Sequence, residues 1–217
     1  MVALTLLDYV KIVGSSAVVG STTGALISGG FTFFRERRDR RDVVELSVML
    51  AAETLENYTR ACVQAIYRDS EAQAEASRNV SYDPLRGLRL PEFAYPDRID
   101  WKVMPKDVVG RLREFPNAVG ASRSHIINVS EYDDPFDNCD RITVACANLG
   151  TTAWGLGATV RAEFGLPRAT LHEHEENLFS VLDERLERDR AHRARMKAMP
   201  SPFDLMGPRA DVGTPEQ

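Results

Sequence analysis

The sequence predicts an all-α protein in which a single N-terminal transmembrane helix continues into a cytoplasmic antiparallel bundle of about four helices. Three observations predict this class: an uncharged segment followed by arginines, apolar residues at helical spacing through most of the later chain, and the lack of an alternating strand pattern. The 217 residues are 43% hydrophobic and 27% charged, which is the composition of a globular protein. The chain after residue 35 is long enough to bury a core without disulfides.

Residues 12–34 are the predicted transmembrane helix. These 23 residues contain no charged side chain. At about 1.5 Å per residue the helix covers roughly 34 Å, slightly more than the ~30 Å hydrocarbon core of a bilayer. Because cytoplasmic flanks carry the excess of Lys and Arg, we expect residues 1–11 outside and the rest of the chain inside. The basic residues that set this orientation and would meet the headgroups are Arg35, Arg37, Arg38, Arg40 and Arg41.

Other interpretations of this glycine-rich segment fit less well. A phosphate-binding loop needs a lysine after its second glycine, but Ser21 follows Gly20 here. A cleaved signal peptide carries its positive charges before the apolar core, whereas these arginines come after it. A buried glycine-rich helix of a soluble domain and a disordered leader remain as alternatives.

Small residues recur every four positions within the same segment. In lipid, small side chains at this spacing let two helix backbones approach closely. We therefore expect the protein to associate with a second copy or with another membrane protein. The predicted contact row is Ser16, Gly20, Gly24 and Ser28, and a parallel row lies beside it at Ala17, Ser21, Ala25 and Gly29.

The chain then predicts a long helix and an irregular crossing. Residues 35–78 place apolar side chains at spacings of three and four, which indicates a stalk that becomes a bundle helix. Residues 79–105 contain four prolines, which exclude a continuous helix, and enough aromatic residues to argue against disorder. We expect an ordered crossing segment whose rings pack on the bundle or form a partner surface. The candidate surface residues are Phe93, Tyr95 and Trp101.

Residues 106–199 are expected to supply the remaining bundle helices. One should cover 106–130, kinked or split at Pro116. The next should run from about 136 to 164, with Asp134 as its cap and Gly165 as its stop. The last should open at Thr170 with a capping box and reach about residue 196, and residues 200–217 are expected to be a disordered tail.

No sequence motif indicates a catalytic, cofactor or metal site. His172 and Glu176 share a helical face, but two ligands do not make a metal site. The acids between residues 131 and 140 lack the spacing and glycine of a calcium loop. Ser122 and His125 lie close together without a nucleophile elbow. The net charge of −5 argues against nucleic-acid binding, and the three cysteines indicate buried thiols in a reducing compartment.

The functional expectation is a membrane-anchored cytoplasmic scaffold or interaction protein of the inner membrane, which associates through its transmembrane helix. One alternative is an enzyme whose site is assembled across the bundle. For that class we expect a deep pocket in which His125, Glu or Cys side chains converge. The other alternative is a membrane-active protein such as a pore or a holin-like factor, which a single weak span and a large following domain disfavour.

Overall fold

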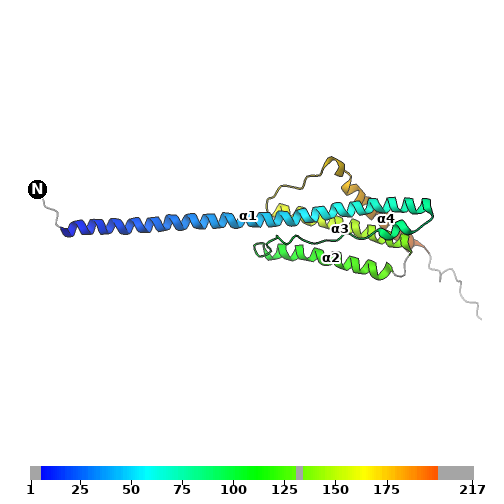
Figure 1. Cartoon of the computed structure of the whole chain (residues 1–217), viewed down its shortest axis with the longest axis horizontal. Helices are drawn as coiled ribbons and strands as arrows, with labels where there is room; N and C mark the ends of the chain where they lie inside the picture. Colours follow the sequence, from blue (N-terminus) through cyan, green and yellow to red (C-terminus); the bar gives the residue numbers. More distant parts are fainter. Residues whose placement is uncertain (1–5, 131–133, 200–217) are drawn as a thin grey trace, which may run out of the picture.

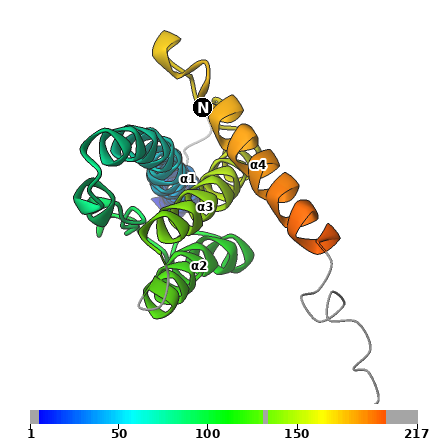
Figure 2. The same cartoon turned by 90° about the vertical axis from the view of Figure 1, so that its right-hand side faces the viewer.

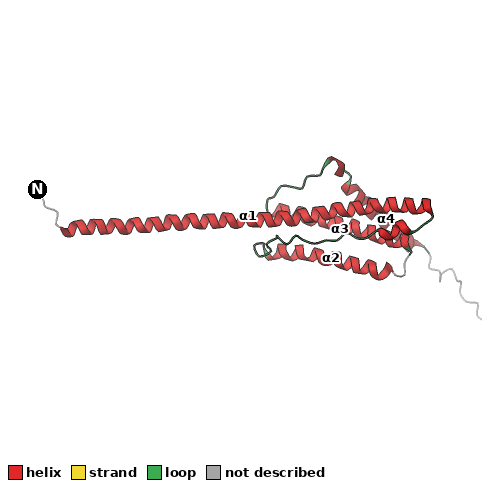
Figure 3. Ribbon diagram, in the orientation of Figure 1, coloured by secondary structure: helices red, strands yellow, loops and turns green. Residues whose placement is uncertain are grey.

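The structure is a computed structural model, and it is all-α over the residues that it describes. It describes the backbone of residues 6–130 and 134–199, and the side chains of residues 38 and 40–199 other than 130–133 and 174. The elements in chain order are α1 (Leu6–Asn79), the short 3-10 helix η1 (Asp83–Gly87), α2 (Lys106–Ser130), α3 (Pro135–Glu163), the 3-10 turn η2 (Glu173–Glu175) and α4 (Leu178–Ala198). Figure 1 and Figure 3 show a helical bundle with no strand in this part of the chain, which confirms the predicted all-α bundle.

The helix α1 is 74 residues long, which corresponds to about 110 Å at ~1.5 Å per residue. Its N-terminal half extends away from the other helices, and its C-terminal half packs within the bundle (Figure 1). The two helices predicted for 12–34 and 35–78 are therefore one continuous element. It ends at Asn79, and the next residue, Val80, has a φ of 50°, an unusual conformation for a β-branched side chain.

The part of the chain that the structure describes contains no helix that is long and apolar enough to cross a membrane. The predicted span at 12–34 lies outside the residues whose side chains are described, although their backbone belongs to α1. The spanning role of this segment therefore stays a prediction.

The helix α3 lies at the centre of the bundle. The C-terminal half of α1 packs along one side of it, and α2 and α4 pack against it at two other positions (Figure 2). The chain direction of α3 is opposite to that of α1 and of α2 (Figure 1). The close approach to α4 depends on Gly150, where a Cβ atom would lie 3.3 Å from both Cys62 and Leu182.

The crossing segment between η1 and α2 returns the chain along the bundle and fills the space between α1 and α2. Phe93 is the centre of its packing, with ring centroids 5.2 Å from Tyr58 of α1 and 4.8 Å from Phe115 of α2. Tyr95 stacks edge-on against Phe93 at 4.8 Å and against Trp101 at 5.2 Å. The predicted ordered crossing is thus present, and it contributes a layer of the core.

Pro116 does not split α2, which runs unbroken from Lys106 to Ser130. A proline lacks the N–H that would bond to the carbonyl four residues earlier, here that of Leu112. The hydroxyl of Tyr95 donates a hydrogen bond to this carbonyl, with an O–O distance of 3.0 Å. A residue of the crossing segment therefore satisfies the acceptor that Pro116 leaves unpaired, and Leu112 itself is fully buried.

Local signals place the ends of α3 correctly. The Asp134 side chain accepts a hydrogen bond from the Phe136 N–H at 2.8 Å, and Pro135 occupies the first turn. At the other end Gly165 adopts a φ of 65°, and the Leu166 N–H bonds to the Arg161 carbonyl at 2.9 Å. This left-handed glycine is the expected helix stop.

The prediction for the last helix is wrong at its start. The helix α4 begins at Leu178, and Thr170 lies in an irregular segment before η2. The capping box belongs to η2 instead, where the Glu175 carboxylate accepts from the His172 N–H at 3.2 Å. The same carboxylate also accepts from Arg60 Nε at 2.6 Å, and this tie to α1 holds the segment away from a helical continuation of α4.

Candidate functional site

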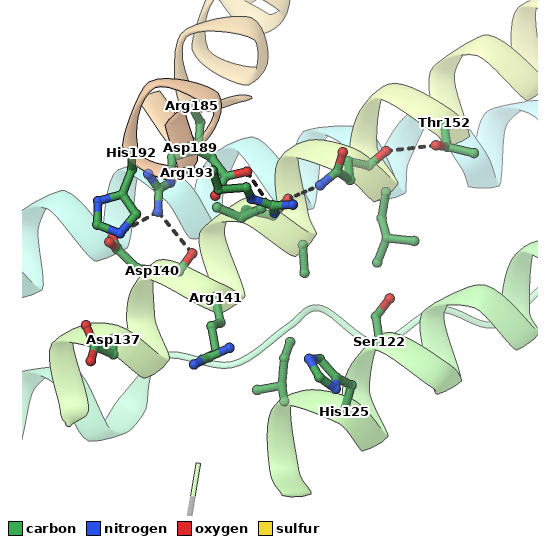
Figure 4. A pocket seen from close by; sticks show the side chains of 15 residues that line it. Ser122, His125, Asp137, Asp140, Arg141, Thr152, Arg185, Asp189, His192 and Arg193 are labelled. Carbon is green, nitrogen blue, oxygen red and sulfur yellow. Dashed lines mark hydrogen bonds and ion pairs between the residues drawn. The ribbon is translucent and has the colours of Figure 1, made fainter. Parts of the chain in front are cut away.

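A groove of about 600 Å³ lies over α3, between α2 and α4 (Figure 4). Apolar side chains form its floor: Ile126 of α2 and Val144, Ala145 and Leu149 of α3. Polar and charged side chains form its edges: Ser122 and His125 of α2, Asp137, Asp140, Arg141, Asn148 and Thr152 of α3, and Arg185, Asp189, His192 and Arg193 of α4. The groove therefore combines an apolar base with a charged rim supplied by three helices.

One wall of the groove is fixed by Arg185. Its Nε donates to Thr143 Oγ1 at 2.8 Å, and its Nη2 donates to the carbonyl and the carboxylate of Asp140 at 3.0 and 2.9 Å. Only 13% of the Arg185 side chain is exposed, but Asp140 is 63% exposed, so the bond to Thr143 is better shielded from water than the bonds to Asp140. Arg185 thereby joins the middle of α4 to the start of α3.

Beyond Arg185 the helix α4 separates from α3. Leu182 is 1% exposed, whereas Met196, on the same face four turns later, is 56% exposed. Between them Arg193 forms an ion pair with Asp189 on its own helix at 2.8 Å, and Arg193 is itself 66% exposed. Toward its C-terminal end α4 diverges from the other helices (Figure 2), and residues 190–199 are all exposed.

The groove brings together only some of the residues expected in an enzyme site. His125 and Ser122 both line the groove, but no hydrogen bond joins them in the described part of the chain. No Glu or Cys side chain lines this groove. Among the described residues no three His, Cys, Asp or Glu side chains are grouped closely enough to hold a metal ion.

Two of the acidic residues between 131 and 140, and a third acid in η2, have structural roles. Asp134 caps α3, and Asp140 accepts from Arg185. The hydrogen bond from Arg60 lowers the pKa of Glu175, so this carboxylate stays ionised and holds η2 on α1. Figure 4 shows Asp137 and Asp140 on the same helix at one end of the groove.

Two buried acidic side chains were missed by the sequence analysis. Glu56 and Arg161 form a bidentate ion pair between α1 and α3, with Nε–Oε1 and Nη2–Oε2 distances of 2.6 and 3.0 Å and exposed fractions of 5% and 8%. Asp69 is also buried, and its Oδ1 has no hydrogen-bond partner. Burial raises the pKa of Asp69, an effect opposed by the hydrogen bond from Gln73.

The three cysteines are fully buried free thiols, as the sequence analysis expected. Burial raises the pKa of Cys139 to about 12, and its Sγ donates weakly to the Leu85 carbonyl at 3.7 Å. Hydrogen bonding with Cys62, together with burial, raises the pKa of Cys146. All three thiols are buried away from solvent, which is typical of structural cysteines and not of reactive ones.

The predicted membrane residues lie mostly outside the described side chains. This applies to Ser16, Gly20, Gly24, Ser28, Arg35 and Arg37. Arg38, Arg40 and Arg41 are described and exposed, and Arg41 pairs with Glu45 at 2.7 Å.

The predicted partner surface of Phe93, Tyr95 and Trp101 is occupied within the molecule. All three rings are half-buried, pack in the crossing segment and contact the core. The guanidinium of Arg113 also covers the Trp101 ring at 5.4 Å from its centroid. The sequence left two roles open for these rings, packing on the bundle and binding a partner. Their contacts within the molecule account for the first role.

Comparison with protein-family models, curated proteins and solved structures finds no match for this chain. The functional argument therefore depends on the chain's own residues. Within the part of the chain that the structure describes, the packing of the bundle does not explain the groove or the projecting half of α1.

Proposed function

We propose that this protein is a membrane-anchored cytoplasmic interaction protein. Residues 12–34 span the inner membrane with the N-terminus outside, and the arginines that follow contact the lipid headgroups. The bundle then stands in the cytoplasm, directly below the membrane. A second copy, or another membrane protein, pairs with the small-residue row at Ser16, Gly20, Gly24 and Ser28.

The observation that carries this proposal is the continuity of α1. The uncharged segment lies on the half of α1 that extends away from the bundle (Figure 1). A helix that is rich in Gly, Ser and Thr and makes no tertiary contacts is marginal in water. In lipid the same backbone must satisfy its hydrogen bonds internally, so the helical state is strongly favoured. A membrane therefore provides the environment in which this half of α1 is stable.

Membrane fractionation tests the anchor. We expect the full-length protein to stay with membranes after washing in alkaline carbonate, and a chain of residues 35–217 to be soluble and helical. Release of the full-length protein by carbonate would refute the anchor.

Cysteine labelling tests the orientation. The three native thiols are buried and give a low background. A membrane-impermeant maleimide applied to sealed right-side-out vesicles should label Thr5→Cys but not Ser201→Cys. The reverse pattern would overturn the proposed orientation while leaving the anchor intact.

A membrane two-hybrid assay tests the pairing. We expect Gly20→Leu with Gly24→Leu to weaken self-association, because leucine side chains keep the two backbones apart. The matched control is Ser15→Leu with Thr22→Leu, which adds bulk on the opposite face of the helix. Equal signals from the two double variants would remove the small-residue row from the proposal.

A further inference from the structure

The helix α1 carries three apolar side chains on the side that faces away from the bundle. Val43 is 42% exposed, Leu46 is 53% exposed and Leu50 is half-buried, and the spacings of three and four residues place them on one face of the helix. We call this face the outer stripe. Val48 and Leu55, which are fully buried in the core, lie about 160° away round the helix at ~100° per residue. The outer stripe is therefore apolar surface that the bundle leaves largely uncovered.

The outer stripe has the residue pattern of a parallel two-stranded coiled coil. Val43, Leu46 and Leu50 take successive a, d and a positions of a heptad, and a β-branched residue at a with leucine at d favours two strands. The apolar pattern ends at the next two seam positions, Glu53 and Asn57. So short a seam is weak between free molecules, and it needs the high effective concentration that a shared membrane anchor provides.

The outer stripe also lies on the side of α1 that carries small residues in the predicted span. Because α1 is one continuous helix, positions along it can be compared round its axis. Measured from residue 20 at ~100° per residue, the small row that begins at Ala17 is centred at about 120° and the outer stripe at about 110°. The helix α3 covers the opposite side of α1, and α1 lies at the edge of the bundle (Figure 2). Two copies that pair on the small row would therefore bring their outer stripes together and keep their bundles apart.

Two acidic positions interrupt the apolar seam between the span and Val43. The heptad places Glu36 at an a position and Asp39 at a d position. The segment 35–41 also contains five arginines, so cationic side chains outnumber the acids in each copy. Because this segment is expected at the headgroup layer, anionic lipids there offset the remaining positive charge of both copies. These acids therefore do not prevent the approach of two copies, and the apolar contact begins at Val43.

We propose that the outer stripe of α1 binds the outer stripe of a second copy of this protein, side by side in the same membrane. The pair is parallel, so each residue of the stripe meets the same residue of the second copy, which is the isologous contact of a closed dimer. Leu46 lies at the centre of the contact, and the polar residues from Glu53 onward mark its end. This inference rests on the proposed function, and it commits to a second copy where that proposal also allows another membrane protein.

Cysteine crosslinking tests the contact with the full-length protein in the membranes of the expressing cells. The three native thiols are buried and give a low background. A short bismaleimide should join two copies of Leu46→Cys into a covalent dimer. The matched control is Glu45→Cys, because the Glu45 side chain is 35% exposed and lies about 130° from the outer stripe at ~100° per residue. We expect loss of the dimer band in the control.

A charge variant tests whether the outer stripe itself makes the contact. Val43→Lys with Leu50→Lys places like charges opposite each other in the pair, so the Leu46→Cys crosslink should be lost. The matched control is Ala74→Lys with Ser77→Lys, which adds the same charges at exposed positions near the end of α1 and should keep the crosslink. Val43 is 42% exposed, so Val43→Lys alone keeps the test valid if the change at Leu50 unfolds the bundle.

Three results would overturn the proposal. The first is the absence of a Leu46→Cys dimer, and the second is an equal dimer yield from Leu46→Cys and Glu45→Cys, which indicates random collision. The third is a Leu46→Cys crosslink only to a protein of another mass, because that protein would then be the occupant. Fractionation tests the anchor without the crosslinker, so a protein that stays with membranes and forms no Leu46→Cys dimer keeps the proposed function and loses only this contact.

Discussion

Replacing Tyr95 by Phe removes one hydroxyl and tests how α2 accommodates Pro116. The Tyr95 hydroxyl is the donor to the Leu112 carbonyl, at 3.0 Å. The substitution leaves the ring in place between Phe93 and Trp101, because those contacts involve carbon atoms only. The expected loss of stability therefore reports on a single hydrogen bond.

The size of the stability loss follows from the burial of the Leu112 carbonyl. Leu112 is 0% exposed, so no water replaces the lost donor. A buried acceptor left without a partner costs about 1–3 kcal/mol. For a domain of this size, about 2–4 °C in Tm accompanies each kcal/mol, so the Tm should fall by roughly 2–12 °C.

Urea unfolding followed by tryptophan fluorescence measures this loss. Both tryptophans of the chain, Trp101 and Trp154, lie in the bundle, so the signal reports the bundle and not the projecting half of α1. Tyr82→Phe is the matched control, because Tyr82 is 51% exposed while its ring also contacts another ring, that of Phe136. We expect no measurable change for the control.

A double-mutant cycle isolates the mechanism. In Pro116→Ala the restored backbone N–H supplies the Leu112 carbonyl with a helical donor. In this background Tyr95→Phe should lower the free energy of unfolding by less than it does with Pro116 present. The coupling energy between the two sites should be at least about 0.5 kcal/mol. An equal cost of Tyr95→Phe in the two backgrounds would refute the link between the hydroxyl and the proline.

Three further predictions concern buried charge and backbone strain. Glu56→Ala should destabilise the bundle by about 3–5 kcal/mol, because the charge of Arg161 is left buried without its partner. Replacing both residues, in Glu56→Leu with Arg161→Leu, should recover most of this loss. Additive losses of the two single changes in urea unfolding would contradict the argument. Asp69→Asn should stabilise the protein at pH 7 and give a smaller gain near pH 4. The raised pKa of Asp69 means that the native state binds this proton more tightly than the unfolded state does, so stability falls as pH rises through the native pKa. An equal gain in urea midpoint at both pH values would exclude this cause. Val80→Gly should raise stability by about 1–2 kcal/mol, since Val80 has a φ of 50° and is 93% exposed; an unchanged thermal midpoint would show that the strain is negligible.

The sequence predicted part of the candidate site and missed the rest for identifiable reasons. Ser122 and His125 were singled out, and both line the groove. Arg185 was not singled out, although it lies three residues after the buried Leu182 on the apolar stripe of α4. That spacing was the signal that could have identified it. No sequence pattern indicates the pairing of Glu56 with Arg161, because the two residues are 105 positions apart.

By itself the sequence determined the all-α class, the cap and stop of α3, and the ordered crossing rich in proline and aromatic residues. These features depend on interactions within a few residues: side-chain periodicity, a capping carboxylate, a glycine at positive φ. Only the tertiary structure decided that α2 continues through Pro116, that α4 begins at Leu178 and that α3 is central. Each depends on a contact between distant residues, such as Tyr95 with Leu112, Arg60 with Glu175 or Gly150 with Leu182. The groove exists for the same reason, because Leu182 and Arg185 hold the first half of α4 on α3, whereas residues 190–199 are exposed.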